Sequence, residues 1–505
     1  MILLVKTDES KLKNSSIITK VTKGGIRYMR KFGTKKSISL LMAMTMITGN
    51  IGTGMPVMAS ETETDTAITS AKFSFGTEKL DGYTNVDAQT VYSDESGYGF
   101  STSEYPAQAE GWVGGVYYPR TVVFTDSNSS YITDSSNYVT VASKVWKETE
   151  STGYGVYTYE NTSTFDVKLD SADYTVKVEL TNPTDPDVTV NLEAEDITKA
   201  TGVVVKAHET KTSTFIACLV DGRLNLKFLA DSSATDESSA ALSNVYLSKV
   251  EVEKQTREQG SKPTVFIASD STVQTYDANY YPQTGWGQVL YNFFKGAENV
   301  NEYECDDCNY SQAQTYETDS VIVENRAIGG RSSKSFIEEG KLDDLLEDVK
   351  PGDYVLVQWG HNDATAARPN RYVSSDDFEK WLQYYVDGVE QRGGTCILVT
   401  PVARRSYTTD AEGNASFKSD FEKYRQVMLK MGEEKNVPVL DLTKASIEVC
   451  NKFGEEGSKS LFLWLNAGDY TGAYAGGVSD STHLQYYGAY KFAQCVAKLI
   501  KEYDK

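Results

Sequence analysis

The sequence predicts two successive folded regions, an antiparallel β-sandwich followed by an α/β/α domain built on a parallel sheet. Short segments with alternating apolar residues dominate residues 71–255, and a period of two is typical of half-buried strands. From residue 262 onward, short apolar runs alternate instead with longer segments of helical spacing. Such alternation is typical of a parallel sheet that is covered by helices on both faces.

A leader segment precedes both regions. Residues 1–59 contain ten lysines and arginines against two acidic residues, and residues 37–48 form a short apolar run. This run has about half of the ~20 residues that a membrane span needs. Small residues at 57–59 fit the pattern that a signal peptidase reads. We therefore expect a signal peptide over 1–59, a linker over 60–70, and a secreted mature chain without a membrane anchor.

The composition is strongly acidic. Fifty lysines and arginines stand against 71 aspartates and glutamates, which gives a net charge of −21. The expected signal peptide carries +8, so its removal leaves about −29. A chain of this charge repels nucleic acid and anionic membrane surfaces, so we expect neither as a partner.

The chain has few cysteines for its length, six in 505 residues, so disulfides are not expected to form its framework. Cys305 and Cys308 form a lone Cys-x-x-Cys motif without an evident second pair of zinc ligands. A local disulfide between them is one interpretation, which the sequence leaves open. Cys396, Cys450 and Cys495 lie within strand or helix patterns and are expected to be buried free thiols.

The strands of the first region are marked by apolar residues two positions apart. These residues are Phe165, Val167 and Leu169; Tyr174, Val176, Val178 and Leu180; Val188, Val190 and Leu192; Leu224, Leu226 and Phe228; Val245 and Leu247; Val250 and Val252. The rhythm resembles the galactose-binding-like sandwiches that accompany secreted carbohydrate enzymes. That resemblance implies a carbohydrate-binding module, while a spacer or a docking wall for the next domain is the alternative.

The second region contains apolar runs of strand length and segments of helical spacing in alternation. The predicted strands are 264–268, 321–323, 354–359, 396–400 and 437–442, and the predicted helices are 285–294, 333–348, 376–391, 417–433 and 484–502. In the fourth helix, Phe417, Phe421, Tyr424 and Met428 step by three and four residues and so share one face.

Four short polar blocks lie where such a sheet exposes them, at the ends of strands or before the last helix. They are residues 269–273, 325–332, 360–363 and 480–483. A doubly wound sheet brings the carboxyl ends of its strands together at one crevice. We therefore expect the four blocks to meet in a single site.

Ser271 in the first block is weakly nucleophilic unless a base accepts its proton. The chain has three histidines, and His208 belongs to the first region, so the base is His361 or His483. Asp480 precedes His483 by three residues, close enough to orient the imidazole and to stabilise its protonated form.

An oxyanion that forms on a substrate needs hydrogen-bond donors. The backbone N–H groups of Ser271 and Gly330 and the side-chain amide of Asn362 are the candidates, and one such donor is worth about 3 kcal/mol of activation barrier.

The four blocks resemble those of the SGNH hydrolases, which are also called GDSL-type esterases. Within that class, Asp270-Ser271-Thr272-Val273, Gly330-Arg331-Ser332, Gly360-His361-Asn362-Asp363 and Asp480-Ser481-Thr482-His483-Leu484 resemble the rhamnogalacturonan acetylesterase family, and Trp286 in its Gly-Trp-Gly-Gln context also fits. The resemblance covers about residues 263–505. It implies a flavodoxin-like α/β/α fold without a metal or cofactor.

The resemblance also implies roles for individual residues. Ser271 is the nucleophile, His483 the base and Asp480 the residue that orients it, while Ser271, Gly330 and Asn362 form the oxyanion hole. The family's usual glycine before the Asp-Ser pair is Ser269 here, and its side chain is expected to crowd the turn.

Three further residues of the matching blocks are expected to contact substrate, namely Trp286, Arg331 and His361. Together with Arg404 and Arg405, Arg331 is expected to make the cleft locally basic.

The expected function is that of a secreted, monomeric carbohydrate esterase, which removes acetyl groups from a plant polysaccharide, rhamnogalacturonan above all. An acetyl xylan esterase, or a lipase or aryl esterase, would use the same site on another ester. A catalytically inactive glycan-binding protein is the third possibility, although the four complete blocks speak against it.

Overall fold

The computed structural model describes residues 70–503 apart from 103–110, 114–115, 119–131, 150–155, 196, 237, 240, 297 and 304–312. The expected signal peptide, nearly all of the expected linker and the Cys305/Cys308 pair lie outside the described residues. Within the described ranges, no helix combines the length and the apolar character that a bilayer crossing requires.

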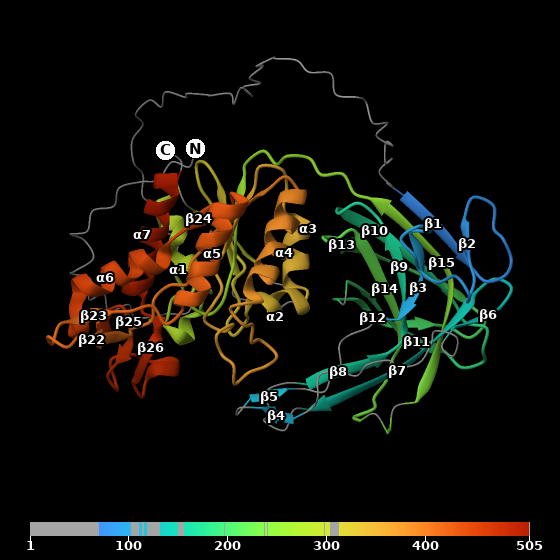
Figure 1. Ribbon diagram of the computed structural model, residues 1–505, viewed down its shortest axis with the longest axis horizontal. Helices are drawn as coiled ribbons and strands as arrows, with labels where there is room; N and C mark the ends of the chain where they lie inside the picture. The colour runs from blue at the N-terminus through green and yellow to red at the C-terminus, as the bar shows by residue number, and fades with distance from the viewer. Residues whose placement is uncertain are drawn as a thin grey trace, which may run out of the picture. The chain divides into compact units, whose positions relative to one another are not determined.

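Residues 70–254 form a β-rich region with two main sheets (Figure 1). The eight-stranded sheet contains β1 (Ser70–Phe75), β2 (Thr84–Val86), β6 (Ile132–Asp134), β7 (Val139–Thr149), β8 (Val156–Asn161), β10 (Asp173–Thr181), β13 (Thr210–Cys218) and β15 (Leu242–Lys254). The five-stranded sheet contains β3 (Tyr98–Thr102), β9 (Ser163–Lys168), β11 (Val188–Ala194), β12 (Ile197–Val205) and β14 (Arg223–Ala230), and β4 (Gly111–Val113) pairs with β5 (Val116–Tyr118) in a separate hairpin. The two main sheets contribute alternate side chains to one hydrophobic cluster.

The alternation of apolar residues changes phase inside β15, where Leu247 and Val250 are both buried although they are three residues apart. The pairing with β10 shifts at this point, because Glu179 pairs with Lys249 whereas Leu180 pairs with Leu247. An extra residue in one strand returns the following side chains to the same face of the sheet. A β-bulge therefore keeps both halves of β15 facing the core.

Residues 264–503 contain a seven-stranded sheet in the order β17-β18-β19-β16-β20-β21-β24. Its strands are β16 (Thr264–Ala268), β17 (Glu298–Tyr303), β18 (Ala313–Glu317), β19 (Ile322–Asn325), β20 (Tyr354–Val357), β21 (Thr395–Val399) and β24 (Val439–Leu440). The five strands from β19 to β24 in this order are parallel, and β17 and β18 add an antiparallel edge. The largely parallel sheet that the sequence predicts is confirmed, and β17 and β18 are an addition to it.

Helices cover both faces of this sheet. They are α1 (Trp286–Val289), α2 (Ser333–Glu338), α3 (Lys341–Asp348), α4 (Phe378–Gln391), α5 (Glu422–Lys435), α6 (Leu442–Gly457) and α7 (Tyr486–Tyr503). Val265 and Ile267 of β16 join a core with α1, α6 and α7, whereas Phe266 and Ala268 join a core with α3, α4 and α5. Figure 1 shows α6 and α7 on the opposite side of the sheet from α3 and α4.

The structure differs from the predicted helices at three places. The segment predicted as one helix over 333–348 is two helices, because Gly340 between them has a φ of 74° that breaks helical geometry. The helix predicted over 417–433 begins only at Glu422, since Ala415–Phe417 is a strand, β23, that pairs with β22 (Tyr407–Thr409). Helix α6 has no counterpart among the predicted elements.

Candidate active site

A hydrogen-bonded chain joins Ser271, His483 and Asp480. Ser271 lies in the turn after β16, and the other two residues lie on β26 (Val478–Leu484), which pairs with β25 (Phe462–Leu465). Nε2 of His483 is 2.9 Å from Oγ of Ser271, and Nδ1 is 2.7 Å from Oδ2 of Asp480. Because an ionised carboxylate only accepts hydrogen bonds, Nδ1 carries a hydrogen and Nε2 is left to accept the serine proton.

Asp480 is held in its ionised form. Burial works against its charge, but the hydrogen bond and charge of His483 and the backbone N–H groups of Thr482 and His483 outweigh it and lower the pKa of Asp480 to about 2. Those backbone groups donate to Oδ1 over 2.6 and 3.1 Å, so Oδ2 remains free for the imidazole. The carboxylate is thus fixed in position by its own strand before it meets the histidine ring.

Hydrogen bonds within the turn and from Gln358 stabilise the turn that carries Ser271. Oδ1 of Asp270 accepts hydrogen bonds from the backbone N–H and the hydroxyl of Thr272, over 2.9 and 2.8 Å. The side-chain amide of Gln358 donates to the same hydroxyl over 2.9 Å. Ser269, where the related motif has glycine, is fully buried and donates from Oγ to the Gln358 carbonyl oxygen over 2.7 Å. Its hydroxyl therefore forms part of the support beneath the turn.

Trp286 is completely buried beneath this turn. Its indole Nε1–H donates to Oε1 of Gln358 over 3.0 Å, and its backbone N–H donates to the Thr272 carbonyl oxygen over 3.1 Å. The structure therefore places the tryptophan that was expected to contact substrate in the core, where it orients Gln358. The neighbouring Gly285 permits this packing, because a Cβ there would lie 2.2 Å from the carbonyl carbon of Val273.

Three candidate hydrogen-bond donors lie in the segments that follow β16, β19 and β20, which are neighbouring strands of the sheet. In the described part of the chain, no acceptor takes the backbone N–H of Ser271 or of Gly330. Gly329 brings the second of these close, since a Cβ on it would lie 3.4 Å from Cβ of Ser271. The amide nitrogen of Asn362 donates to the Arg331 carbonyl oxygen over 2.7 Å, which uses one of its two hydrogens and leaves the other free.

Asp363 connects the second polar block (residues 325–332, the glycine block) to the third (residues 360–363, the asparagine block). Its fully buried carboxylate accepts hydrogen bonds from the backbone N–H and the hydroxyl of Ser333, over 3.0 and 2.5 Å, and from the backbone N–H of Gly360 over 2.9 Å. Gly360 has a φ of 136°, a value that favours glycine. Asp363 therefore holds the start of α2, next to Gly330, against the segment that carries Asn362.

His361, another residue expected to contact substrate, is only 3% exposed. Its Nδ1 is 3.4 Å from Oδ2 of the buried Asp270, and its ring centroid is 4.5 Å from that of Phe421. Burial works against the charge of Asp270, but the nearby charge of His361 and the hydrogen bonds from Thr272 lower the pKa of the carboxyl group. The histidine therefore lies beneath the site, beside the residue that precedes the nucleophile.

The arginines that were expected to make the cleft basic have different surroundings. Arg331 pairs with Glu339 over 2.8 Å and donates to the Gly329 carbonyl oxygen over 3.0 Å. Arg405 is buried and donates to Oγ of Ser458 over 3.1 Å. Both guanidinium groups are thus engaged within the protein, whereas Arg404 has no carboxylate within salt-bridge distance among the described residues.

The segments that follow Ser271 and His483 carry a group of tyrosines, the tyrosine rim, which consists of Tyr276, Tyr280, Tyr281 and Tyr486. Oη of Tyr276 donates to the Ser271 carbonyl oxygen over 2.6 Å, and its ring centroid is 6.1 Å from that of Tyr280. Tyr280, Tyr281 and Tyr486 are 39, 55 and 37% exposed, respectively. An exposed tyrosine offers an apolar ring together with a polar hydroxyl, so these side chains are candidates for substrate contact.

One group in the described ranges has the spacing of metal ligands, Cys218 with Asp343 and Glu347, and none of the three belongs to the triad. Nζ of Lys199 forms an ion pair with Asp343 and lies 3.7 Å from Glu347. The ammonium group already supplies the positive charge that these carboxylates need.

Sequence reasoning missed Gln358 and Tyr276, which support the turn, and it assigned no role to Asp363, a residue of the third block. Gln358 left one signal in the sequence, because it is a polar residue directly after the apolar run of β20 (Tyr354–Val357). Asp363 also accepts from Ser333, 30 residues earlier, which only the fold brings near, and the bond of Tyr276 depends on the turn that brings the chain back to Ser271.

Residues 265–496 match the model of the family described as GDSL-like lipase/acylhydrolase. The chain is 35% identical over 239 residues to the probable rhamnogalacturonan acetylesterase YesY of Bacillus subtilis (strain 168), a match that covers 47% of this chain and 92% of the relative. It is 32% identical over 238 residues to the rhamnogalacturonan acetylesterase RhgT of the same organism, covering 47% and 89%. A third relative in that organism, the uncharacterized esterase YxiM, is 25% identical over 398 residues, covering 78% of this chain and 84% of its own length.

Proposed function

The chain belongs to the GDSL-like lipase/acylhydrolase family, and from that premise we propose that it deacetylates rhamnogalacturonan, a pectic polysaccharide, outside the cell. Ester hydrolysis follows from the family, and a carbohydrate ester is supported by two acetylesterase relatives that match over residues of the same domain. The chain of hydrogen bonds from Asp480 through His483 to Ser271 is the observation that carries the proposal.

In the proposed mechanism, Ser271 Oγ attacks the acetyl carbonyl carbon while its proton moves to Nε2 of His483. Asp480 stabilises the imidazolium, and the N–H donors of Ser271, Gly330 and Asn362 bind the oxyanion. The tetrahedral intermediate then expels the sugar oxygen, which takes the proton from His483 and leaves an acetyl-serine. A water molecule, deprotonated by His483, attacks that ester and releases acetate, and the proton returns to Ser271.

The surface near the site favours a sugar over a long acyl chain. In the described ranges, the large exposed apolar side chains close to the triad are tyrosines, and the exposed aliphatic ones, such as Leu80 and Leu242, belong to the β-rich region. A tyrosine offers an apolar face together with a polar hydroxyl, which suits a pyranose ring, whereas a lipid site needs a continuous apolar patch.

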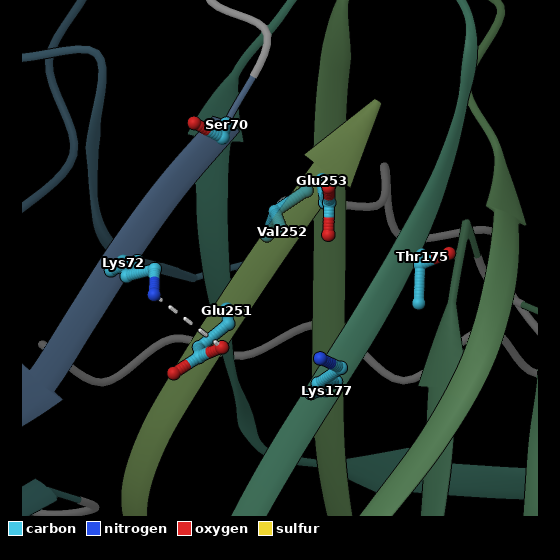
Figure 2. Close-up of a pocket in the computed structure, with 7 residues that line it drawn as sticks. All are labelled: Ser70, Lys72, Thr175, Lys177, Glu251, Val252 and Glu253. Atoms are coloured by element: carbon cyan, nitrogen blue, oxygen red, sulfur yellow. Dashed lines mark ion pairs between the residues drawn. The ribbon is translucent and has the colours of Figure 1, made fainter. Parts of the chain in front are cut away.

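The role proposed for the β-rich region is structural support, with its two sheets as the layers of a galactose-binding-like sandwich. A depression on its eight-stranded sheet is shown in Figure 2, and its lining consists of Ser70, Lys72, Thr175, Lys177, Glu251, Val252 and Glu253. Lys72 lies opposite Glu251 across β1 and β15, with Nζ and Oε2 3.9 Å apart. None of the seven residues is aromatic, and cross-strand charge pairs of this kind stabilise a sheet.

Acetate release across a panel of esters tests the proposed function. The panel contains acetylated rhamnogalacturonan, acetylated xylan and p-nitrophenyl esters from acetate to laurate, and each is also incubated with the Ser271→Ala variant. Fastest turnover of the acetylated rhamnogalacturonan supports the proposal. Faster turnover of the xylan would instead identify an acetyl xylan esterase, and faster turnover of the long-chain esters a lipase, with the same catalytic mechanism.

A further inference from the structure

Two arginines beside the site lack the carboxylate partners that six other arginines have. Six arginines of the described residues form ion pairs with acidic side chains: Arg223 with Asp166, Arg257 and Arg392 with Asp173, Arg326 with Glu324 and Asp348, Arg331 with Glu339, and Arg425 with Asp441 and Glu422. Arg371 and Arg404 have no carboxylate of a described residue within 4.0 Å. This is unexpected in a chain where 71 acidic residues outnumber 50 basic ones.

Arg371 lies against the glycine block of the oxyanion hole. Its Nη1 donates to the Gly330 carbonyl oxygen over 3.0 Å, while its Nε is buried without an acceptor. Burial and the nearby charges of Arg368 and Arg331 lower the pKa of Arg371, whereas Asp270 and Asp363 act in the opposite direction. The guanidinium of Arg371 thus lies next to Gly330 without a carboxylate of a described residue in salt-bridge contact.

Arg404 lies near His361, because both side chains contact Phe421. It follows β21 in a loop whose next residue, Arg405, donates its backbone N–H to the Ser481 carbonyl oxygen over 2.8 Å, close to the catalytic aspartate and histidine. The guanidinium carbon of Arg404 is 4.8 Å from the ring centroid of Phe421, the residue that also contacts His361. Its Nε is buried without an acceptor, like that of Arg371.

We propose that Arg371 and Arg404 bind carboxylate groups of the polysaccharide, which makes the site selective for acetylated chains that contain uronic acid. The proposal rests on the proposed function and deepens it by assigning the residues that recognise the substrate's charge. A guanidinium is permanently charged and matches a carboxylate with two parallel hydrogen bonds. In Arg371 and Arg404, the N–H groups beyond the contacts described here have no partner in the described protein.

The overall charge of the chain makes such local cations necessary. A net charge of −21 repels a polyanion at a distance, but salt screens this repulsion beyond ~8 Å at physiological ionic strength. At contact distance, the attraction between two unpaired arginines and the carboxylates of the substrate then outweighs the remaining repulsion. We therefore expect the anionic substrate to be recognised by short-range contacts instead of long-range steering.

The alternative role is structural, because Arg404 stacks on Phe421 and Arg371 supports Gly330. A loss of support impairs turnover of every ester, charged or neutral. A loss of carboxylate binding impairs only the turnover of charged chains. The ratio of kcat/KM for a charged polymer to kcat/KM for its neutral counterpart separates the two roles.

The experiment compares acetylated rhamnogalacturonan with the same polymer after chemical reduction of its carboxyl groups, and measures acetate release by the full chain. The wild-type enzyme is expected to prefer the acidic polymer. Arg404→Gln and Arg371→Gln are each expected to lower the acidic-to-reduced ratio about 10-fold, the typical effect of one charge-assisted hydrogen bond. Arg404→Lys, which keeps the charge, is expected to retain part of the ratio.

Lys430→Gln is the matched control, because it removes one positive charge from the exposed surface of α5. It should leave the ratio unchanged. Equal release from both polymers by the wild-type enzyme, or equal losses on both polymers in the two arginine variants, would overturn the carboxylate assignment alone. Absence of release from either polymer, with p-nitrophenyl acetate still hydrolysed, would overturn the proposed function and the assignment with it.

Discussion

The hydroxyl of Ser269 donates a hydrogen bond to the backbone carbonyl oxygen of Gln358 over 2.7 Å, and both residues are fully buried. Ser269 directly follows β16 and Gln358 directly follows β20, so the bond joins the ends of two neighbouring parallel strands. The serine that replaces the related motif's glycine therefore makes a contact of its own and does not crowd the turn.

Replacing Ser269 tests this contact. Ser269→Ala is expected to lower the free energy of unfolding by about 1 kcal/mol, because it removes the buried hydrogen bond to the Gln358 carbonyl oxygen and a longer one from the Gln358 amide. Ser269→Val is expected to cost more, since a branched side chain must also fit a close-packed position. Urea unfolding of the three proteins measures both effects. An alanine variant as stable as the wild type would mean that the bond contributes nothing.

Asn362→Ala removes the one side-chain donor of the proposed oxyanion hole. We expect kcat on p-nitrophenyl acetate to fall about 10²–10³-fold with little change in KM, because the donor acts on charge that develops in the transition state. Asn414→Ala, at an exposed hairpin turn, is the matched control and should leave kcat unchanged. A rise in KM with kcat preserved would assign Asn362 to substrate binding.

Asp480→Asn is expected to lower kcat about 10⁴-fold, because an amide favours the wrong tautomer of His483. The same carboxylate affects stability. Its pKa is lowered to about 2 in the folded chain, so its stabilising contribution is fully present above its usual value near 3.8 and is lost as the pH falls through 2. Allowing for solvent screening, this contribution amounts to about 1–2 kcal/mol.

The stability difference between the wild type and Asp480→Asn should therefore be larger at pH 6 than at pH 2.5. Denaturant unfolding at the two values measures it. A difference that stays constant between them would show that the ionised carboxylate contributes no stability.

Tyr281→Ala tests the tyrosine rim of the site. We expect KM for acetylated polysaccharide to rise severalfold while kcat/KM for p-nitrophenyl acetate stays unchanged, since only the polymer extends to the rim. Tyr503→Ala, near the end of α7 and similarly exposed, serves as the control. Equal effects of the two variants on the polymer would remove the rim from the binding surface.

For the candidate site, the sequence was most informative where a residue stands beside a local structural marker. Ser271 and His483 were recognisable because each stands beside its own structural marker, an apolar strand or the start of the last helix. The burial of Trp286 and His361 could not be predicted from the sequence, because it depends on which distant segments the fold packs against them. Helix α6 and the β22–β23 hairpin were missed for a similar reason: their patterns are short or mixed, and tertiary packing decides them.

The central claim is that Ser271 forms an acetyl-enzyme, and single-turnover kinetics on acetylated rhamnogalacturonan tests it most directly. We expect the wild-type enzyme to release acetate with a covalent acetyl group detectable on Ser271. Ser271→Ala should fold normally but lose about 10⁵–10⁶-fold in kcat. Acetate release by Ser271→Ala at a rate near that of the wild type would contradict the account.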